Sequence, residues 1–283
     1  MRPIITSTAP PPGFTIGGVA DPCFEVPRLV ALYDPLDPDR ADLLAYLGMA
    51  GEFCARSVLD IGCGTGTLAC VLATLGLEVT GLDPAAASLD IARAKPGGDR
   101  VRWVHGDVTA LPPLQVDLAV MAGNVAQVFL GDDEWQQVLA AAHAALRPGG
   151  RLVFETRDPA RRAWEEWDRA HTYGEHDVPG AGTVTDWLEV TQVSGDLVTF
   201  RWTVRFAADG AELTSDSTLR FRSREETAES LRAAGFDVDE IRGAPDRPGR
   251  EFVFVARRAD RTDRVAGAAG VAGVARPAWP RRS

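Results

Sequence analysis

The sequence predicts an α/β fold, in which a doubly wound and largely parallel sheet carries a small antiparallel insert. Between residues 57 and 155, short apolar runs alternate with helical stretches. This alternation is typical of βαβ units whose strands are covered by helices on both faces. After residue 160 the pattern changes to alternating apolar and polar residues, which indicates antiparallel strands. A chain of 283 residues fits one large domain with such an insertion.

Five strands are expected in the first part of the chain, each short, apolar and followed by a loop. They span residues 57–61, 78–82, 101–105, 118–121 and 151–155, with helices at 68–75, 85–94 and 133–146. The last helix is expected to end before Pro148, because proline cannot continue a helix and the two following glycines accept a turn. A helix at 224–234 and two further strands at 237–241 and 251–256 follow near the end.

The insert is expected to be a three-stranded meander at residues 183–193, 197–206 and 212–221. Gly195 and Gly210 lie between these runs, and glycine is favoured in hairpin turns. We therefore expect one domain at residues 25–258, with the antiparallel insert at about 160–223. Residues 1–24, rich in proline and glycine, are expected to form a flexible arm, and the Ala/Gly/Arg-rich residues 259–283 a disordered tail.

Composition narrows the class of protein. The net charge of −10 argues against a general affinity for nucleic acid, whose phosphates need a basic surface. No apolar run approaches the roughly 20 residues that span a bilayer, and the N-terminal residues lack the pattern of a signal peptide. The four cysteines form no CxxC pair, so we expect reduced thiols and a cytoplasmic protein that does not associate with membranes.

The strongest functional signal is the run VLDIGCGTGTLA at residues 58–69. A buried strand ends near Asp60, and Gly62, Gly64 and Gly66 alternate through the turn that leads into a helix. Glycine lets the backbone approach a ligand closely, and the free N–H groups at the start of a helix face that ligand. In open α/β sheets, ligands bind at the carboxyl ends of the strands, where this loop lies.

Three further features stand at the ends of neighbouring strands. Asp83 ends the second strand about 20 residues further on, where a carboxylate can accept both hydroxyls of a ribose. Asp107 ends the third strand, where an acid can accept a hydrogen bond from the exocyclic amine of adenine. The fourth strand opens into Ala122-Gly123-Asn124-Val125, whose small residues leave room above the sheet.

Together these motifs resemble the class I S-adenosylmethionine-dependent methyltransferases over residues 57–157, in the small-molecule type of that family. The resemblance implies a seven-stranded Rossmann-like sheet whose last strand is inserted antiparallel, and S-adenosyl-L-methionine as the cofactor. It implies that Asp60, Gly62, Gly64 and Gly66 hold the methionine part, Asp83 the ribose, and Asp107 with Val108 the adenine. An insert after the fifth strand roofs the acceptor site in related enzymes, which favours a small molecule such as a metabolite or natural-product intermediate.

Several alternatives stay open beside this interpretation. A dehydrogenase is disfavoured, because the turn lacks the spacing of the G-x-G-x-x-G motif and no Tyr/Lys proton relay is evident. Two interpretations remain. One is a methyltransferase that acts on tRNA or protein, and the other is a protein that binds S-adenosylmethionine without catalysis. The apolar face of the insert either lines an acceptor chamber or forms a homodimer interface.

The sequence singles out further residues for the site without identifying a general base. Tyr33 is expected to close over the cofactor, and the alternative is an aromatic side chain packed on the core. Asn124 is expected to orient the substrate or the methionine amine, or else only to shape its loop. Arg157 is a candidate to anchor a carboxylate, with an ion pair to Glu155 or Asp158 as the alternative.

His171 and Tyr173, with His176, are expected in a loop that enters the insert, where either of the first two is a candidate catalytic residue. Their spacing is not a recognised metal motif, so no metal is expected. Methyl transfer requires little from the protein beyond holding the two reactants in line, so the absence of an evident catalytic triad does not count against the activity.

Overall fold

The structure is a computed structural model that describes residues 20–38, 40 and 42–259. A seven-stranded sheet forms its centre, with the strand order β10-β11-β5-β4-β1-β2-β3. Its strands are β1 (Ser57–Ile61), β2 (Glu78–Asp83), β3 (Arg102–His105), β4 (Val116–Met121), β5 (Leu146–Arg157), β10 (Phe236–Gly243) and β11 (Glu251–Arg258). Neighbouring strands are parallel except that β11 runs antiparallel to both β5 and β10. The expected α/β fold is confirmed, including its one reversed strand.

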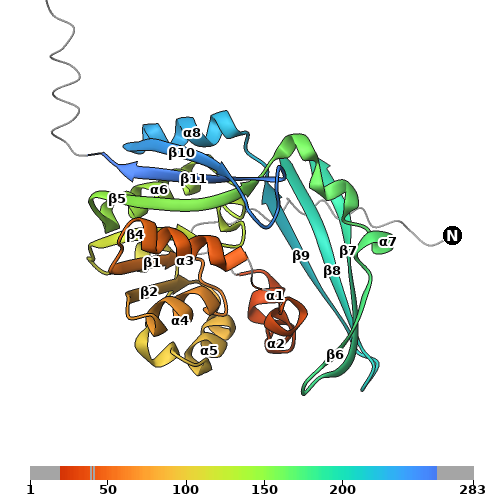
Figure 1. The fold of residues 1–283 in the computed structure, drawn as a ribbon. Helices are drawn as coiled ribbons and strands as arrows, with labels where there is room; N and C mark the ends of the chain where they lie inside the picture. The colour runs from red at the N-terminus through yellow and green to blue at the C-terminus, as the bar shows by residue number, and fades with distance from the viewer. Residues whose placement is uncertain (1–19, 39, 41, 260–283) are drawn as a thin grey trace, which may run out of the picture.

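Helices cover both faces of this sheet (Figure 1). They are α3 (Asp42–Glu52), α4 (Thr67–Thr74), α5 (Ala86–Ala94), α6 (Asp132–Ala145) and α8 (Arg224–Ala233). Trp135 of α6 and Leu231 of α8 pack with Phe154 of β5 in one core, whereas Leu72 of α4 packs with Val58 of β1 in a second core. The two cores explain why the strand sequences are apolar on both faces. Among the described residues, no helix is both long and apolar enough to cross a membrane.

The segment after α6 differs from the sequence-based expectation. The helix ends at Ala145, and β5 already begins at Leu146, which pairs with Val116 of β4. The pairing then shifts and resumes between Arg151 and Leu118. The expected turn at residues 147–150 is therefore an irregularity within the strand, and Gly149 takes a φ of +78° there.

A second sheet forms the insert between β5 and α8 and has the order β6-β7-β8-β9. Its strands are β6 (Gly174–Val178), β7 (Gly182–Ser194), β8 (Leu197–Phe206) and β9 (Glu212–Arg220). The expected three-stranded meander is thus wrong by one strand. The interval assigned to a loop contains helix α7 (Arg169–Thr172), which holds His171, and strand β6, which holds His176. Val178 is the only buried residue of β6, so the alternating pattern was too weak to predict it.

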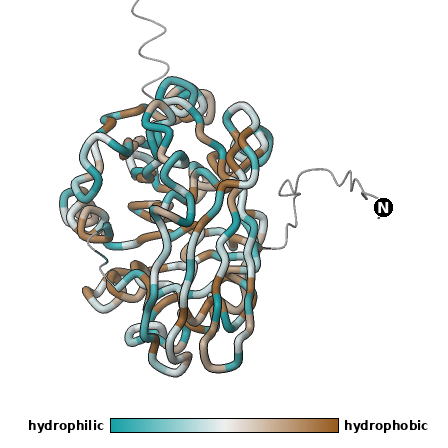
Figure 2. The backbone as a smooth tube through the Cα atoms, turned by 90° about the vertical axis from the view of Figure 1, so that its right-hand side faces the viewer, coloured by the Kyte–Doolittle hydropathy of each residue, from teal (hydrophilic) through white to brown (hydrophobic). Residues whose placement is uncertain are grey.

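One face of this second sheet packs on the rest of the molecule, and the other faces outward. Figure 2 is turned toward this sheet, and hydrophilic and hydrophobic residues alternate along its strands. Val184, Val204 and Phe206 pack on Leu29 and Leu32 of helix α2 (Pro27–Leu36). Val198, Phe200 and Trp202 of β8 lie on the packed face together with Val204 and Phe206, but Trp187 of β7 does not. It pairs with Thr203, so its side chain lies on the opposite face.

The N-terminal segment lies between the two sheets (Figure 1). Residues 1–19 of the expected arm lie outside the described residues, as do residues 260–283 of the expected tail. From residue 20 onward the expectation of a flexible arm is wrong, because helix α1 (Pro22–Glu25) is anchored at both ends. The N–H of Cys23 donates to Ser215 of β9 at 3.0 Å, and the hydroxyl of Ser88 donates to the carbonyl of Phe24 at 2.9 Å. Both partners are distant in sequence, so local composition does not show them.

Candidate functional site

The glycine-rich loop between β1 and α4 has a backbone that other residues rarely adopt. Gly62 and Gly64 have φ values of +71° and +52°. The N–H groups of Gly62 and Cys63 both donate to the carbonyl of Leu82, at 2.8 and 3.1 Å, so the loop is tied to the end of β2. A Cβ atom on Gly64 would meet no atom within 4 Å. Gly64 therefore presents its backbone to open space, as a ligand-binding loop requires.

Two buried carboxylates stand beside this loop. Asp83 accepts hydrogen bonds from the N–H groups of Gly64 at 2.7 Å and Ala85 at 2.8 Å, which joins the loops after β1 and β2. Burial raises the pKa of Asp83, against these two bonds. Burial, together with the nearby charge of Asp83, raises the pKa of Asp60 to about 7, although the Arg40 guanidinium opposes this shift. Both pKa values are raised because the two carboxylates are buried. A bound cation would stabilise their charged forms.

A third carboxylate follows β3. Asp107 accepts hydrogen bonds from the N–H of Thr109 at 2.8 Å and from its hydroxyl at 2.6 Å. These bonds cap the short helix η2 (Val108–Ala110) and fix the Asp107 side chain at the end of the strand.

The ends of β1, β2 and β3 border one cavity of about 210 Å³. Among the residues that the sequence indicated for cofactor binding, its wall contains Tyr33, Asp60, Gly62, Gly64, Asp83, Asp107 and Val108. The structure thus brings together side chains from four separate segments of the chain. The wall also contains charged and aromatic residues that sequence analysis did not find, namely Asp21, Phe24, Arg40 and Glu134. No local motif marks these four, because they reach the cavity from helices and from the segments that flank them, whose placement depends on tertiary contacts.

A polar cluster holds helix α2, and with it Tyr33, against the glycine-rich loop. Lys95, the only lysine in the sequence, lies 2.7 Å from a carboxylate oxygen of Asp34. Its ammonium group also donates to the hydroxyls of Thr65 at 3.0 Å and Thr67 at 2.7 Å, and the Thr65 hydroxyl donates to Asp34 at 2.8 Å. Because Thr65 and Thr67 also line the cavity, this cluster fixes one of its walls.

Gly66 does not line the cavity, although it belongs to the same motif. A Cβ atom on Gly66 would lie 2.5 Å from the ring of Trp103 and 2.7 Å from Ala92 of α5. Its φ of +75° and this close approach explain why glycine is needed there. Gly66 lets α4 begin next to its neighbours, and the structure gives it a packing role beside the cavity.

Asn124 also departs from expectation. Its backbone adopts a φ of +61°, and its side chain lies in a second cavity of about 30 Å³, near Glu251 at 3.4 Å. Its N–H donates to the buried carboxylate of Glu155 at 2.6 Å. The left-handed backbone turns the side chain away from the larger cavity, which Asn124 was expected to line and does not. Asn124 shapes the loop after β4 instead.

None of the three candidate catalytic residues lines the larger cavity. Arg157 is held within the protein, where it donates to the side-chain oxygen of Gln127 at 3.1 Å and lies 3.9 Å from Glu251. Its ion pair is therefore with Glu251, and not with Glu155 or Asp158 as the sequence suggested. A guanidinium engaged in this way is not available to anchor a ligand in the cavity.

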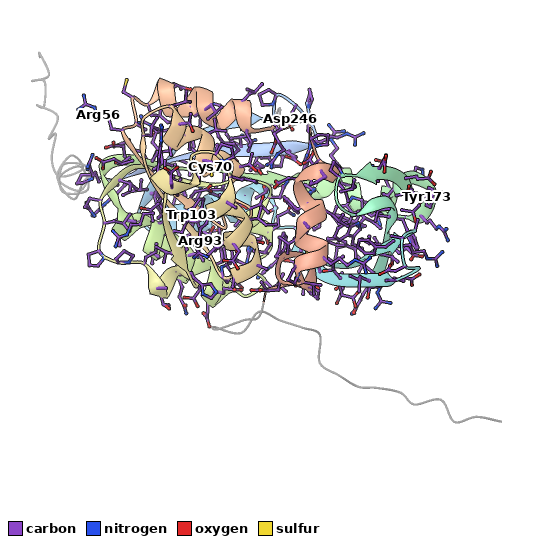
Figure 3. All side chains as sticks on the ribbon, turned by 90° about the horizontal axis from the view of Figure 1, so that it is seen from below. Arg56, Cys70, Arg93, Trp103, Tyr173 and Asp246 are labelled. Atoms are coloured by element: carbon purple, nitrogen blue, oxygen red, sulfur yellow. The ribbon has the colours of Figure 1, made fainter. Side chains whose placement is uncertain are left out.

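His171 and Tyr173 lie on the outer side of the insert. The His171 ring contacts Asp168 at 2.9 Å, and 62% of the His171 side chain is exposed. The Tyr173 ring packs on Trp187 at a centroid distance of 6.4 Å. Figure 3 places Tyr173 on the antiparallel sheet, at the end of the molecule away from Trp103. Neither side chain is placed to act on a ligand in the cavity. No cluster that could hold a metal ion occurs among the described residues, which include all four histidines.

Comparison with known proteins agrees with this geometry. A family model for a methyltransferase domain matches residues 58–150, which contain all three strand-end carboxylates. The bifunctional biotin biosynthesis protein of Cellvibrio japonicus is 37% identical over 135 residues, covering 45% of this chain and 26% of that protein. The ubiquinone biosynthesis O-methyltransferase of Klebsiella pneumoniae is 34% identical over 120 residues, covering 41% of this chain and 48% of that enzyme. The chain thus spans about a quarter to a half of the length of these relatives.

An amino pentose methyltransferase from Micromonospora echinaspora, whose structure contains S-adenosylmethionine, superposes with a TM-score of 0.64. It is 28% identical, and the match covers 81% of this chain and 97% of that one. Residues 58–150 therefore belong to a methyltransferase domain of the S-adenosylmethionine-dependent kind. A methyltransferase from Clostridium acetobutylicum, with a TM-score of 0.68 at 16% identity over 82% of this chain and 98% of that one, shows the same fold. The second sheet and the N-terminal helices lie outside the residues that the family model matches.

Proposed function

We propose that the protein transfers the methyl group of S-adenosylmethionine to a small-molecule acceptor. One observation carries the proposal: Asp60, Asp83 and Asp107 stand at the ends of three adjacent strands and share one cavity with the glycine-rich loop. A run of carboxylates at this edge of the sheet suits an elongated ligand that carries a cation, a ribose and a base. S-adenosylmethionine, when bound, supplies a methyl group on a good leaving group, its sulfonium.

The residues of the cavity fit each part of this cofactor. Asp60 is the carboxylate that would hold the methionine ammonium, and Arg40 the guanidinium that would hold the methionine carboxylate. Gly64 supplies a backbone with no side chain in the way. Asp83 would accept the ribose hydroxyls while it keeps the N–H bonds that fix its position. Val108 would pack against the adenine ring.

The acceptor that we propose carries an amine. Asp21, Phe24 and Tyr33 line the cavity from the N-terminal segment, and the two rings lie 5.9 Å apart by their centroids. A carboxylate beside aromatic rings binds a cationic or hydrogen-bonding amine well. Burial raises the pKa of Asp21, while a hydrogen bond from Ser217 of β9 opposes this shift. This proposal agrees with the amino pentose acceptor that the description of the Micromonospora enzyme names.

The chain's contribution to the reaction is positioning and shielding. The strand-end loops of the seven-stranded sheet, the N-terminal segment and α6 line the cavity where the two reactants would meet, which favours an in-line approach and excludes water. An amine attacks as the neutral base, so an ammonium group must lose a proton before transfer, and the methylated ammonium that forms releases a further proton afterwards. Asp21 is the carboxylate of the N-terminal wall that is placed to receive it.

Charge and surface chemistry support the remaining parts of the proposal. A net charge of −10 disfavours a nucleic-acid acceptor. The outer face of the second sheet carries ion pairs, Arg201 with Asp216 at 2.7 Å and Arg205 with Glu212, so it is not an apolar dimer interface. A homodimer, if formed, would use another face. All four cysteines are free, which suits a reducing cytoplasm.

Calorimetry tests the cofactor, with S-adenosylmethionine, S-adenosylhomocysteine and NAD as ligands. We expect binding of the first two only, and binding of NAD alone would overturn the proposal. A methylation screen with labelled S-adenosylmethionine tests the acceptor, using pairs of small molecules that differ only in an amine or a hydroxyl group. We expect label on the amines, and label confined to the hydroxyl compounds would overturn the choice of acceptor but not the activity.

A further inference from the structure

The wall of the cavity contains an acidic residue, Glu134, that sequence analysis did not single out. Glu134 lies in the first turn of α6 and lines the cavity together with Asp107, Val108 and Val138. Its Oε2 atom is buried and has no hydrogen-bond partner among the described residues. A buried carboxylate oxygen left in this way costs free energy unless a donor reaches it. The empty position therefore points to a hydrogen-bond donor supplied by a ligand.

The surroundings of Glu134 indicate the shape of that ligand. Val108, Val128, Phe129 and Val138 form an apolar part of the same wall, which suits a flat ring. Burial raises the pKa of Glu134, backbone groups of Gly131 and Leu130 lower it, and the charge of Asp107 adds to the increase. Glu134 and Asp107 both line the cavity with these apolar residues, and they are close enough for their charges to interact.

We propose that Glu134 and Asp107 together read the exocyclic amine of adenine, each accepting one of its two N–H groups. This inference rests on the proposed function, because it takes adenine to be the base in the cavity. A primary amine on a ring carries two donors in one plane, and two carboxylates that line the same part of the cavity are matching acceptors. Glu134 is then a specificity-determining residue for the cofactor, contributed by α6 and not by a strand end.

The proposal makes a chemical prediction about the base. In hypoxanthine the amine is replaced by a carbonyl oxygen, which would face two carboxylates without a donor between them. A site built to hydrogen-bond an N–H group rejects a ligand that lacks it, because the buried acceptors stay unpaired. The protein should therefore prefer S-adenosylhomocysteine to S-inosylhomocysteine, and Glu134 should account for much of that preference.

The test measures the Kd of both compounds by calorimetry for the full chain and for Glu134→Gln. The glutamine amide keeps the shape of the side chain but offers N–H groups to a carbonyl oxygen. We expect the ratio of the two Kd values to change by about 10- to 100-fold toward the inosyl compound, the range for a hydrogen bond to a charged group. Asp133→Asn is the matched control, because Asp133 is the exposed neighbour in the same turn and its loss removes the same charge.

The outcomes separate the two proposals. An unchanged ratio in Glu134→Gln, with a Tm like that of the wild type, would overturn the role of Glu134 and leave the methyltransferase proposal intact. An equal change in Asp133→Asn would also overturn it, because general charge would then be the cause. If Glu134→Gln does not fold, Glu134→Ala takes its place, with the same loss of preference expected. A wild-type protein that binds neither compound would overturn the proposed function itself.

Discussion

The two sheets of the molecule differ in how their residues reach the site. The seven-stranded sheet places its functional groups through local sequence: a strand, an acidic residue at its end, and a turn. The antiparallel sheet and the N-terminal helices contribute through long-range contacts, such as the bond from Cys23 to Ser215 and the bidentate pair of Arg28 with Asp209. The cofactor half of the site is therefore predictable from local sequence. The acceptor half is assembled from segments whose contacts with one another cannot be predicted from local sequence.

The largest effect is expected at the loop of the seven-stranded sheet. Gly64→Val places a side chain in the space that the ligand needs, at a φ of +52° that valine rarely adopts. We expect calorimetry to show no binding of S-adenosylmethionine. Gly195→Val is the matched control, because Gly195 also has open space and a φ of +62°, but lies in the hairpin between β7 and β8. Binding that survives in Gly64→Val would show that the loop does not face the cofactor.

A second test compares the two ends of the parallel strands, at Asp83 of β2 and Asp117 of β4. Asp83→Asn removes a charged acceptor at the carboxyl end, and we expect S-adenosylmethionine to bind about 1.5–3 kcal/mol more weakly, the range for hydrogen bonds to charged groups. Asp117→Asn is the control at the opposite end, where that carboxylate accepts the N–H groups of Arg56 at 2.9 Å and Ser57 at 3.1 Å. Both variants should lose stability, but only the first should lose affinity. Equal losses of affinity would mean that Asp83 acts through stability alone.

Much of the seven-stranded sheet could be predicted because its signals are local. The bounds of β1 match the expectation residue for residue, and α4 and α5 begin within one residue of it. The failures share one physical cause, which is dependence on distant partners. Strand β6 has one buried residue, α1 is anchored by β9 and α5, and Glu134 reaches the cavity only because α6 packs against η2.

Asn124 and Arg157 illustrate a different limit. Both follow a strand of the sheet, as residues of this kind of site do, and the sequence indicated both for that reason. Whether such a side chain faces the cavity depends on backbone angles and on buried partners, here a φ of +61° at Asn124 and the ion pair between Arg157 and Glu251. Position after a strand predicts proximity to a site but not the direction of the side chain.

The pH dependence of binding tests whether the cavity is selective for a cation. Because the pKa of Asp60 is about 7 in the free protein, this carboxyl is increasingly neutral below pH 7 and attracts a cation less. We expect the Kd for S-adenosylmethionine to rise about tenfold between pH 8 and pH 6, as binding requires the charged form. Asp60→Asn should bind weakly at every pH and lose this dependence.

Glu155 supplies the control for that experiment. Burial raises its pKa to about 7 as well, but its side chain lies in the smaller cavity and not in the larger one. For both acids the folded pKa exceeds the ordinary value, so the folded state binds more protons than the unfolded one between about pH 4 and 7. Each therefore lowers the free energy of unfolding as the pH rises through this window. Glu155→Gln should flatten that change in stability but leave the pH dependence of cofactor binding as in the wild type.

The smallest effect is expected on the outer face of the insert. His171→Ala and Tyr173→Phe should leave methyl transfer within about twofold of the wild type, because both side chains lie outside the cavity and His171 is 62% exposed. The ion pair of His171 with Asp168 is a surface contact, which contributes little to stability. Phe24→Ala, on the inner side, is the contrasting variant: it should impair transfer to an amine acceptor, because Phe24 lines the cavity. Single-turnover rates with labelled S-adenosylmethionine distinguish the two positions. If Tyr173→Phe slows transfer as much as Phe24→Ala does, the outer face of the insert takes part in the reaction, and the cavity does not contain the whole acceptor site.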